Sequence, residues 1–304
     1  MSSRAITKIV SKLDNSINWV IPYKNSYLEA RYVRRTPQYI SAYVSSHNGC
    51  TMGCKFCWLT ATKQTTFNHV NADEYITQLN PILEHAKSID GDNSQSVRVN
   101  INFMARGEAL ANKTVVNNYA QVYTGFEQLV KDYGYKTMKI NISTIMPKTI
   151  QYRSLNDIFG KYPTNIYYSI YGINKEFRNK WIPNAMDWQL ALSKLKEYQE
   201  KTSNPITFHF ASIAGQNDKI DEVKQMAEEI RKLKFSTTKF NLVRLNLHPN
   251  MAQYSESDPA RLTEIYEIMK SACCDSSIKT NRSRIVPRVG QDVFASCGMF
   301  FDDQ

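Results

Sequence analysis

The sequence lacks any long apolar stretch. No window approaches the roughly 20 consecutive apolar residues that a membrane-spanning helix requires, although hydrophobic residues make up 42% of the 304 residues, enough for a globular core. The first residues, MSSRAITKIVSKLDNS, also lack the apolar core of a signal peptide. We therefore expect a globular, cytoplasmic protein with no membrane association.

Internal repeats of about 20 to 50 residues and low-complexity tracts are absent as well. A chain of 304 residues can bury a sizeable core and suits one large domain or two modest ones. Structural disulfides are not expected in the cytoplasm. Closely spaced cysteines in that compartment indicate metal binding or catalysis.

Acidic residues are in the minority, since 38 Lys and Arg residues face 28 Asp and Glu residues and leave a net charge of +10. Such a charge attracts polyanions, so RNA is a candidate partner. The basic residues concentrate in two places: Arg31, Arg34 and Arg35 near the start, and Lys279, Arg282, Arg284 and Arg288 near the end. A solvated surface is the alternative interpretation of both groups.

Short segments rich in Val, Ile, Thr, Tyr and Phe alternate with longer amphipathic segments. The predicted strands cover residues 39–46, 97–104, 138–144, 165–171, 206–213 and 238–245. The predicted helices cover residues 72–87, 114–132, 184–202, 218–234 and 258–272. Asn71 and Asp258 are expected N-caps, with Pro259 at the first helical position after Asp258. Six βα units in series predict an α/β fold with a parallel sheet, open or closed into a barrel, whose site lies at the strands' carboxyl ends.

Residues 1–38 precede the first of these strands. The run NSINWVIPYKNSYLEARYV, with Lys24 and Asn25 between two β-like segments, predicts a small β-hairpin laid on the barrel. We expect an N-terminal β extension over residues 1–38 and a barrel with a C-terminal cysteine loop over residues 39–304. We expect no separate N-terminal domain.

The segment SSHNGCTMGCKFCW places Cys50, Cys54 and Cys57 in a CxxxCxxC pattern directly after the first barrel strand. Three thiolates at this spacing suit three irons of a 4Fe–4S cluster. The fourth iron then stays open for the amino and carboxylate groups of S-adenosylmethionine (SAM). A structural zinc ion is the alternative, but it needs a fourth ligand, and His47 is awkwardly placed before Cys50. A disulfide would leave one of the three cysteines unpaired.

With Phe56 beside the last cysteine, this motif resembles the cluster loop of the radical SAM superfamily. The resemblance implies a partial (β/α)6 barrel, in agreement with the six predicted strands. It also implies a 4Fe–4S cluster and SAM as cofactors, a 5′-deoxyadenosyl radical as the reactive species, and an external electron donor such as flavodoxin or ferredoxin.

The likeness narrows to the RlmN/Cfr family of radical SAM RNA adenine methyltransferases, and it extends from about residue 16 to about residue 300. Five segments carry it besides the cluster loop: NFMARGEALANKTVV, INISTIMP, YYSIYGINKEFRNKWIP, FNLVRLNLHP and GQDVFASCGMF. Two of them depart from the family pattern, since Ala109 replaces a usual proline and Tyr171 a usual histidine. The resemblance implies methylation of an adenine carbon in rRNA or tRNA.

The same resemblance assigns contacts with SAM to six residues. They are Gly107, Glu108, Ser143, Ser169, Tyr171 and Asn246. The residues themselves are compatible with this role, because Glu108 follows Gly107 at a strand's carboxyl end, where a carboxylate can bind an ammonium group. Local turn and capping roles are the alternatives. However, four of these residues end strands at the same opening of the predicted barrel, its mouth, where the carboxyl ends of the strands meet: Glu108, Ser143, Ser169 and Asn246.

Cys297 lies in GQDVFASCGMF, remote in sequence from the cluster cysteines. By resemblance it is the methyl carrier: it receives a methyl group from one SAM, and a radical from a second SAM abstracts a hydrogen from that methyl group. The carbon radical then adds to an adenine amidine carbon. Glu29 resembles the family's proton acceptor, with a one-residue difference in spacing. A buried cysteine and a surface glutamate are the alternatives.

Tyr43 is the most serious departure from the family, which has a cysteine at this position that resolves the covalent enzyme–RNA adduct. Tyrosine cannot form the required disulfide. Three explanations stay open: Cys273 or Cys274 supplies the thiol, release follows another route, or the reaction has another outcome. Packing at a helix end is the alternative interpretation of Cys273 and Cys274. We also expect the family's helical N-terminal domain to be absent.

We predict a monomeric enzyme that methylates rRNA or tRNA and takes electrons from an external donor. A second hypothesis is a radical SAM enzyme of different outcome that acts on a small molecule or peptide without RNA methylation. A third is a non-enzymatic RNA-binding or scaffold protein with zinc in place of the cluster.

Overall fold

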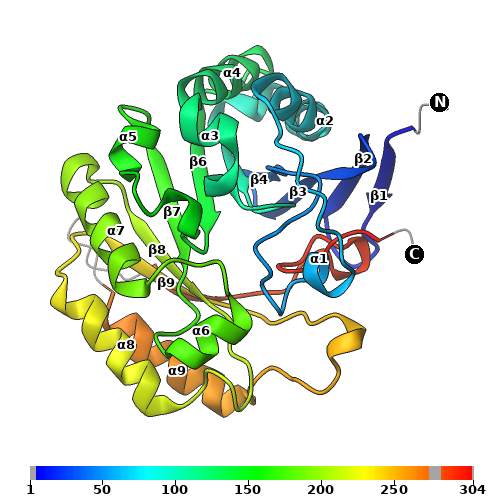
Figure 1. Cartoon of the computed structure of the whole chain (residues 1–304). Helices are drawn as coiled ribbons and strands as arrows, with labels where there is room; N and C mark the ends of the chain where they lie inside the picture. The colour runs from blue at the N-terminus through cyan, green and yellow to red at the C-terminus, as the bar shows by residue number, and fades with distance from the viewer. Residues whose placement is uncertain (1–4, 274–281, 303–304) are drawn as a thin grey trace.

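The computed structural model describes residues 5–273 and 282–302, which form a single ten-stranded mixed sheet with the long helices outside it (Figure 1). The sheet begins antiparallel. Its first strands are β1 (Thr7–Val10), β2 (Ile17–Tyr23) and β3 (Ser26–Thr36), and β3 pairs with β4 (Tyr39–Tyr43). The predicted hairpin is confirmed, and it continues directly into the barrel sheet. The boundary at residue 38 stays a prediction.

From β4 onward the strands run parallel and in chain order. They are β5 (Arg98–Phe103), β6 (Thr137–Thr144), β7 (Thr164–Ser169), β8 (Ile206–Phe210), β9 (Thr238–Val243) and β10 (Arg284–Val286). The predicted α/β class and the six predicted strands are confirmed. The seventh parallel strand, β10, was not predicted, because three largely exposed residues in a basic segment show no strand pattern. The edges β1 and β10 do not pair within the described residues, so the barrel is partial.

The five predicted helices are confirmed with shifts at their ends. They are α2 (Ala72–Asp90), α4 (Tyr119–Asp132), α7 (Trp188–Thr202), α8 (Ile220–Lys232) and α9 (Pro259–Ser271). Asn71 caps α2 by accepting a hydrogen bond from the Glu74 N–H group. Asp258 caps α9 in the same way, by accepting from the backbone N–H group of Arg261. Within the described residues, no helix is both long and apolar enough to cross a bilayer.

Several short helices lie in the loops between strands and long helices. They are α1 (Trp58–Ala61), α3 (Lys113–Asn117), α5 (Leu155–Phe159) and α6 (Lys175–Trp181), with 3-10 turns η1 (Gly91–Ser96), η2 (Ala109–Ala111), η3 (Lys148–Ile150), η4 (Pro249–Met251) and η5 (Gln291–Val293). Asn118 separates α3 from α4 within the segment predicted as one helix. The other short helices were not predicted, because four to seven residues are too few to show a helical period.

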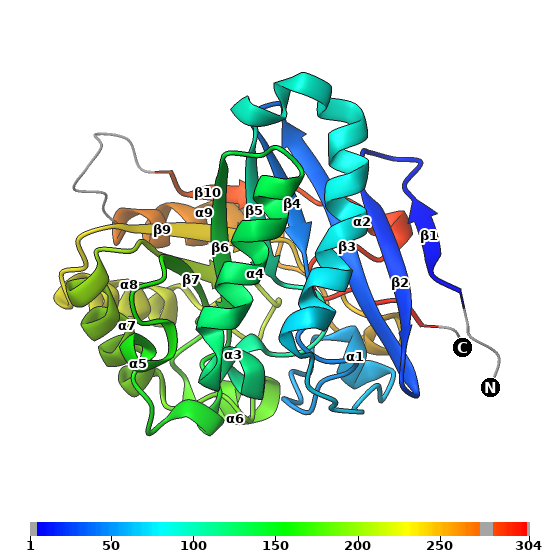
Figure 2. The same ribbon diagram turned by 90° about the horizontal axis from the view of Figure 1, so that it is seen from above.

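Alternation along each strand separates the apolar core from a polar interior. Residues such as Ile101, Ile140 and Ile166 point outward and pack beneath the helices, which Figure 2 shows along the outer side of the sheet. The alternate residues line the barrel's interior. Among them, Asn141 donates a hydrogen bond to Asn102 at 2.8 Å, and Asn165 donates one to Asn141 at 2.9 Å.

Asn112 joins three loops at the carboxyl ends of the strands. Its side chain is fully buried, and its amide donates to the carbonyl oxygens of Ser46 at 2.7 Å and Val70 at 3.0 Å. Its Oδ1 accepts from the N–H group of Val115 at 3.0 Å and so caps α3. One amide therefore holds the start of the cysteine loop, which follows β4 and carries Cys50, Cys54 and Cys57, against the segment that leads into α2.

Replacing Asn112 with alanine should lower the free energy of unfolding by about 2–3 kcal/mol, because two buried carbonyl oxygens lose their donor and α3 loses its cap. Urea unfolding measures the change. Asn118→Ala is the matched control: Asn118 is exposed and makes no side-chain cap bond, so it should cost less than about 0.5 kcal/mol. Equal losses in the two variants would contradict the proposed tie.

Candidate functional site

The CxxxCxxC cysteines lie in the loop between β4 and α1, at the carboxyl ends of the strands (Figure 1). The N–H group of Cys50 donates a hydrogen bond to the carbonyl oxygen of Gln64 at 3.0 Å. Gly49 has no room for a side chain, because a Cβ atom there would lie 2.4 Å from the carbonyl oxygen of Thr66. The loop is therefore folded tightly against its own returning segment, and this path places the three thiols.

The three thiols line one cavity. Burial raises the pKa of Cys50 to about 12 and that of Cys57 to about 11, and it raises the pKa of Cys54 well above its ordinary value. Thiolates at these positions therefore need a compensating cation. Iron supplies that charge, and a 4Fe–4S cluster would take each thiolate on a different iron, so the donor set suits a cluster. Among the described residues, no three His, Cys, Asp or Glu side chains are grouped closely enough to hold a metal ion.

Glu108 lies in the loop after β5, at the same mouth. Its carboxylate accepts hydrogen bonds from the N–H groups of Leu110 and Ile145, each at 3.1 Å. Burial raises the pKa of Glu108 to about 7, and hydrogen bonds from these groups and from Thr144 oppose that rise only in part. A buried carboxylate with neutral donors suits an ammonium group such as that of SAM.

Gly107 turns the chain so that Glu108 reaches the mouth. Its φ is +94°, and a Cβ atom would lie 2.6 Å from both His47 Nδ1 and Ser46 Oγ. Only glycine fits this position without moving the cysteine loop. The ring of Phe67 stacks on that of His47 with 3.8 Å between the ring centroids, so the histidine has little room to move away.

Gly107, Glu108 and the other predicted SAM contacts line the same cavity of about 900 Å³. Ser143 and Ser169 lie at the ends of β6 and β7. Tyr171 lies two residues farther on with a φ of +50°, and its ring centroid is 4.5 Å from that of Phe56 in the cysteine loop. The structure therefore brings together residues that are widely spaced in the sequence.

Cys297 also lines this cavity, and its side chain is exposed there although protein surrounds the site. Burial raises the pKa of its thiol, while the charge of Arg31 opposes the rise. Asn246 holds the loop: its side-chain amide donates to the Cys297 carbonyl oxygen at 3.1 Å, and its Oδ1 accepts from Arg288 Nε at 3.1 Å. Trp58 donates its indole N–H to the Asn246 carbonyl oxygen at 2.9 Å. Asn246 thus positions the Cys297 loop in addition to lining the cavity.

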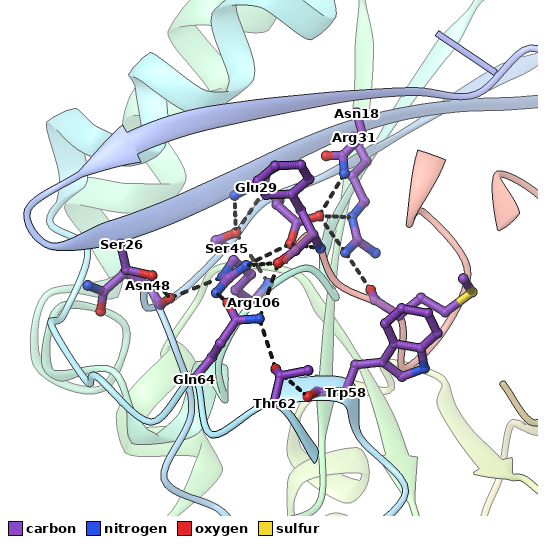
Figure 3. Close-up of polar contacts among 12 residues, drawn as sticks. Asn18, Ser26, Glu29, Arg31, Ser45, Asn48, Trp58, Thr62, Gln64 and Arg106 are labelled. Carbon is purple, nitrogen blue, oxygen red and sulfur yellow. Dashed lines mark hydrogen bonds and ion pairs between the residues drawn. The ribbon is translucent and has the colours of Figure 1, made fainter. Parts of the chain in front are cut away.

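Glu29 is fully buried on β3 and does not line the cavity. Figure 3 shows its carboxylate between Arg31 and Arg106. Oε1 accepts from Arg106 at 3.0 Å and from the Phe301 N–H group at 3.1 Å, while Oε2 accepts from Arg31 at 2.9 Å and from Asn18 at 2.7 Å. Burial alone would raise the pKa of Glu29, but the two arginine charges and the Asn18 bond outweigh it and lower the pKa.

The two arginines extend this network to other segments (Figure 3). Arg106 donates to the Asn48 carbonyl oxygen in the cysteine loop at 3.0 Å and to the Gln64 side chain in the segment that returns after α1. Arg31 donates to the Met299 carbonyl oxygen at 2.8 Å, two residues after Cys297. The role of Glu29 as proton acceptor stays a prediction, and its contacts give it a positioning role between the cysteine loop and the C-terminal loop.

Neither arginine was predicted as a site residue, although a signal for each was present. Arg31 stands two residues after Glu29, on the same face of β3. Arg106 directly precedes the Gly107–Glu108 pair. No local pattern shows that the two would meet on one carboxylate.

The residues considered for the missing thiol are separated by the fold. Tyr43 lines the cavity, and its hydroxyl accepts a hydrogen bond from Arg35 at 3.3 Å. Cys273 follows α9, is buried in the core and does not line the cavity. Cys274 and Lys279 lie outside the described residues.

The chain is similar to known proteins over nearly its whole length. No protein-family model matches the chain. It is 26% identical over 304 residues to the dual-specificity RNA methyltransferase RlmN of Buchnera aphidicola subsp. Schizaphis graminum, with 95% of this chain and 74% of the relative covered. It is 24% identical over 293 residues to the probable dual-specificity RNA methyltransferase RlmN of Alkaliphilus oremlandii, with 96% and 77% covered. A solved radical SAM methyltransferase from Sphaerobacter thermophilus shares the fold, with a TM-score of 0.75 at 18% identity over 97% of this chain and 80% of that one.

Fold and relatives together define a radical SAM enzyme, as the cysteine motif predicted. More narrowly, the chain is a radical SAM methyltransferase, distantly related to RlmN over nearly its whole length. This class uses a 4Fe–4S cluster and SAM. The relatives therefore weigh against a non-enzymatic scaffold.

Glu29→Gln should lower the free energy of unfolding by about 3–5 kcal/mol, because Arg31 and Arg106 would stay buried without their counter-charge. Chemical unfolding at neutral pH measures the loss. Glu127→Gln, which removes an exposed ion pair with Lys131, should change stability by less than about 0.5 kcal/mol. A loss no larger than that of the control would overturn the structural weight given to Glu29.

The stabilities of the wild type and of Glu29→Gln should also respond differently to acid. The pKa of Glu29 lies below its ordinary value of 4.5, so its ion pairs stabilise the fold above that pH and are lost as the pH falls through the folded pKa. The free energy of unfolding of the wild type should therefore fall more steeply below pH 4.5 than that of Glu29→Gln. Parallel curves would show that Glu29 does not titrate differently in the two states.

Proposed function

We propose that this radical SAM methyltransferase methylates an adenine carbon of rRNA or tRNA, and that Cys297 carries the methyl group as a thioether. The supporting observation is that Cys297 faces the cavity lined by Cys50, Cys54 and Cys57. These residues come from opposite ends of the chain, and their common cavity gives the thiol a place beside the radical source.

The proposal gives each group of cavity residues a part. Cys50, Cys54 and Cys57 would hold the cluster, and Gly107, Glu108, Ser143, Ser169, Tyr171 and Asn246 would contact SAM. When bound, these cofactors supply a 5′-deoxyadenosyl radical and a transferable methyl group. Glu108 would bind the ammonium group, whose charge would bring the pKa of Glu108 back toward its ordinary range.

Cys297 must be a thiolate to accept a methyl group. Arg31 favours that ion, because its charge lowers the pKa that burial raises. Arg31 is itself held by Glu29 at 2.9 Å and by the Met299 carbonyl oxygen at 2.8 Å. Glu29 thus supports the reacting thiol through Arg31, whether or not it also accepts a proton.

RNA as the substrate is supported by the net charge of +10 and by the two relatives named as RNA methyltransferases. An electron donor such as flavodoxin or ferredoxin, acting on a monomeric enzyme, completes the proposal. Lys55, beside Cys54, places its ammonium group 5.5 Å from the Trp181 ring centroid, and Lys180 places its own 5.6 Å from the same ring. Two cations beside the cysteine loop suit an acidic donor.

Tyr43 favours a second candidate, a radical SAM enzyme of different outcome that acts on a small molecule or peptide. Within the described lining of the cavity, Cys297 is the one thiol outside the CxxxCxxC motif. Tyr43 occupies the family's second-cysteine position with a phenol that binds Arg35. Such an enzyme would cleave SAM to 5′-deoxyadenosine without methylating Cys297.

Incubation of the anaerobically purified protein with SAM, reductant and RNA distinguishes the candidates. The proposed reaction yields methyladenosine, S-adenosylhomocysteine and 5′-deoxyadenosine together, and the Cys297 peptide gains one methylene. An RNA trapped covalently on Cys297 would show that addition occurs while release is impaired. Cleavage of SAM with unmodified RNA and unmodified Cys297 would favour the second candidate.

Cys297→Ala should reduce methyladenosine to background while the iron and sulfide contents stay unchanged, because the variant removes the carrier and leaves the CxxxCxxC motif intact. Nucleoside mass spectrometry and iron analysis measure the two effects. Cys273→Ala is the matched control: this cysteine is buried in the core, so the variant should still methylate. Methylation that survives loss of Cys297 would refute its role as carrier.

A further inference from the structure

The amino-terminal half of the barrel's interior is lined by cations. Arg98 begins β5, Lys139 lies on β6, Lys239 lies on β9 and Arg284 begins β10, with Arg282 just before it. All five line the cavity that also contains the cysteines. They lie at the opposite ends of the strands from Glu108 and Cys297, so they are not part of the site described above.

These cations differ from the arginines near the mouth. There, Arg31 pairs with Glu29, and Arg244 and Arg288 both pair with Glu256. No ion pair joins Arg98, Lys139, Lys239, Arg282 or Arg284 to an acid in the described part of the chain. Glu108, at the mouth, is the only carboxylate among the lining residues that the structure describes.

Two of the inner cations, Arg98 and Lys239, contact neutral side chains. Arg98 donates to the Asn100 side chain at 2.9 Å and lies 5.5 Å from the Tyr39 ring centroid. Lys239 donates to the Tyr167 hydroxyl at 3.2 Å. These contacts leave most of the donors on both side chains available to a ligand, because guanidinium has five N–H groups and ammonium three.

Strand register brings the cations toward one another. Arg98 and Lys139 are diagonal neighbours on adjacent strands, since Asn100 lies opposite Lys139. Lys239 and Arg284 are related in the same way, since Asn241 lies opposite Arg284. Burial lowers the pKa of Lys139, and the charges of Arg98, Lys239 and Arg282 lower it further. Lys139 therefore lies within electrostatic range of Arg98 on the neighbouring strand and of Lys239 and Arg282 across the interior.

Without a bound anion, such an interior lowers the stability of the fold. Barrel interiors are usually filled by branched apolar side chains, whereas asparagines, a histidine and the five cations line this one. Like charges that repel in a partly buried space destabilise the fold unless an anion joins them. A cluster kept at that cost indicates a ligand.

We infer that this inner cation cluster, formed by Arg98, Lys139, Lys239 and Arg284, binds a phosphate group that enters the barrel through the cavity. Phosphate matches the site because it accepts charge-assisted hydrogen bonds from several guanidinium and ammonium groups at once. The phosphate belongs to the polynucleotide substrate or to a free phosphorylated compound. Only the first source rests on the proposed function.

Titration of the anaerobically purified protein with pyrophosphate, followed by calorimetry, tests the site. The wild type should bind saturably, and the double variant K139Q/K239Q should bind at least about tenfold more weakly, because two charge-assisted contacts are lost. The control is K161Q/K224Q, which removes the same charge from the exposed surface residues Lys161 and Lys224 and should bind within about twofold of the wild type.

Absence of saturable binding by the wild type, unchanged binding by K139Q/K239Q, or equal weakening in the control would overturn the inference. The melting temperature of unliganded K139Q/K239Q should equal or exceed that of the wild type, because repulsion is relieved, and a large fall would overturn the inference too.

Competition by a short single-stranded oligoribonucleotide would assign the site to a substrate phosphate, and its failure to compete would assign it to a free phosphate compound. If the protein binds pyrophosphate but makes no methyladenosine, the phosphate site is supported and the proposed RNA methylation is not.

Discussion

The buried carboxylate of Glu29 is the point on which the arrangement of the mouth depends. A fully buried charge is costly unless several donors satisfy it, and here the donors come from three separate parts of the chain. One of them, the N–H group of Phe301, belongs to the loop that presents Cys297. The carboxylate is therefore fully satisfied only when the C-terminal loop is docked, which couples the position of the reactive thiol to the folding of the N-terminal hairpin.

Arg106 extends that coupling to the cofactor residues. It binds Glu29 and the cysteine loop on one side and directly precedes Gly107 and Glu108 on the other. Because Gly107 has no room for a Cβ atom beside His47, the Glu108 loop and the cysteine loop cannot shift independently. The residues proposed to hold the cluster, SAM and the methyl group are thus linked through one rigid set of contacts rather than placed separately.

Stability and function occupy opposite faces of the same strands. Residues such as Ile101 and Ile140 carry the core beneath the helices, which frees the inner face from packing. That face can then hold asparagines, phenols and cations that form no ion pair with the acids the structure describes, all of which a packed barrel would exclude. Tyr43 belongs to this polar interior, where its hydroxyl accepts a hydrogen bond from Arg35.

The sequence alone determined the fold class, the hairpin and six of the parallel strands, because alternation and helical periods are local signals. It also determined the cysteine motif and, through resemblance, the RlmN-related class. Only the tertiary structure decided that Glu29 meets Arg31 and Arg106 away from the cavity, that Cys273 is buried in the core, and that inner cations from four strands converge. Those outcomes depend on contacts between residues far apart in the chain, and no local pattern encodes which strand registers will bring such residues together.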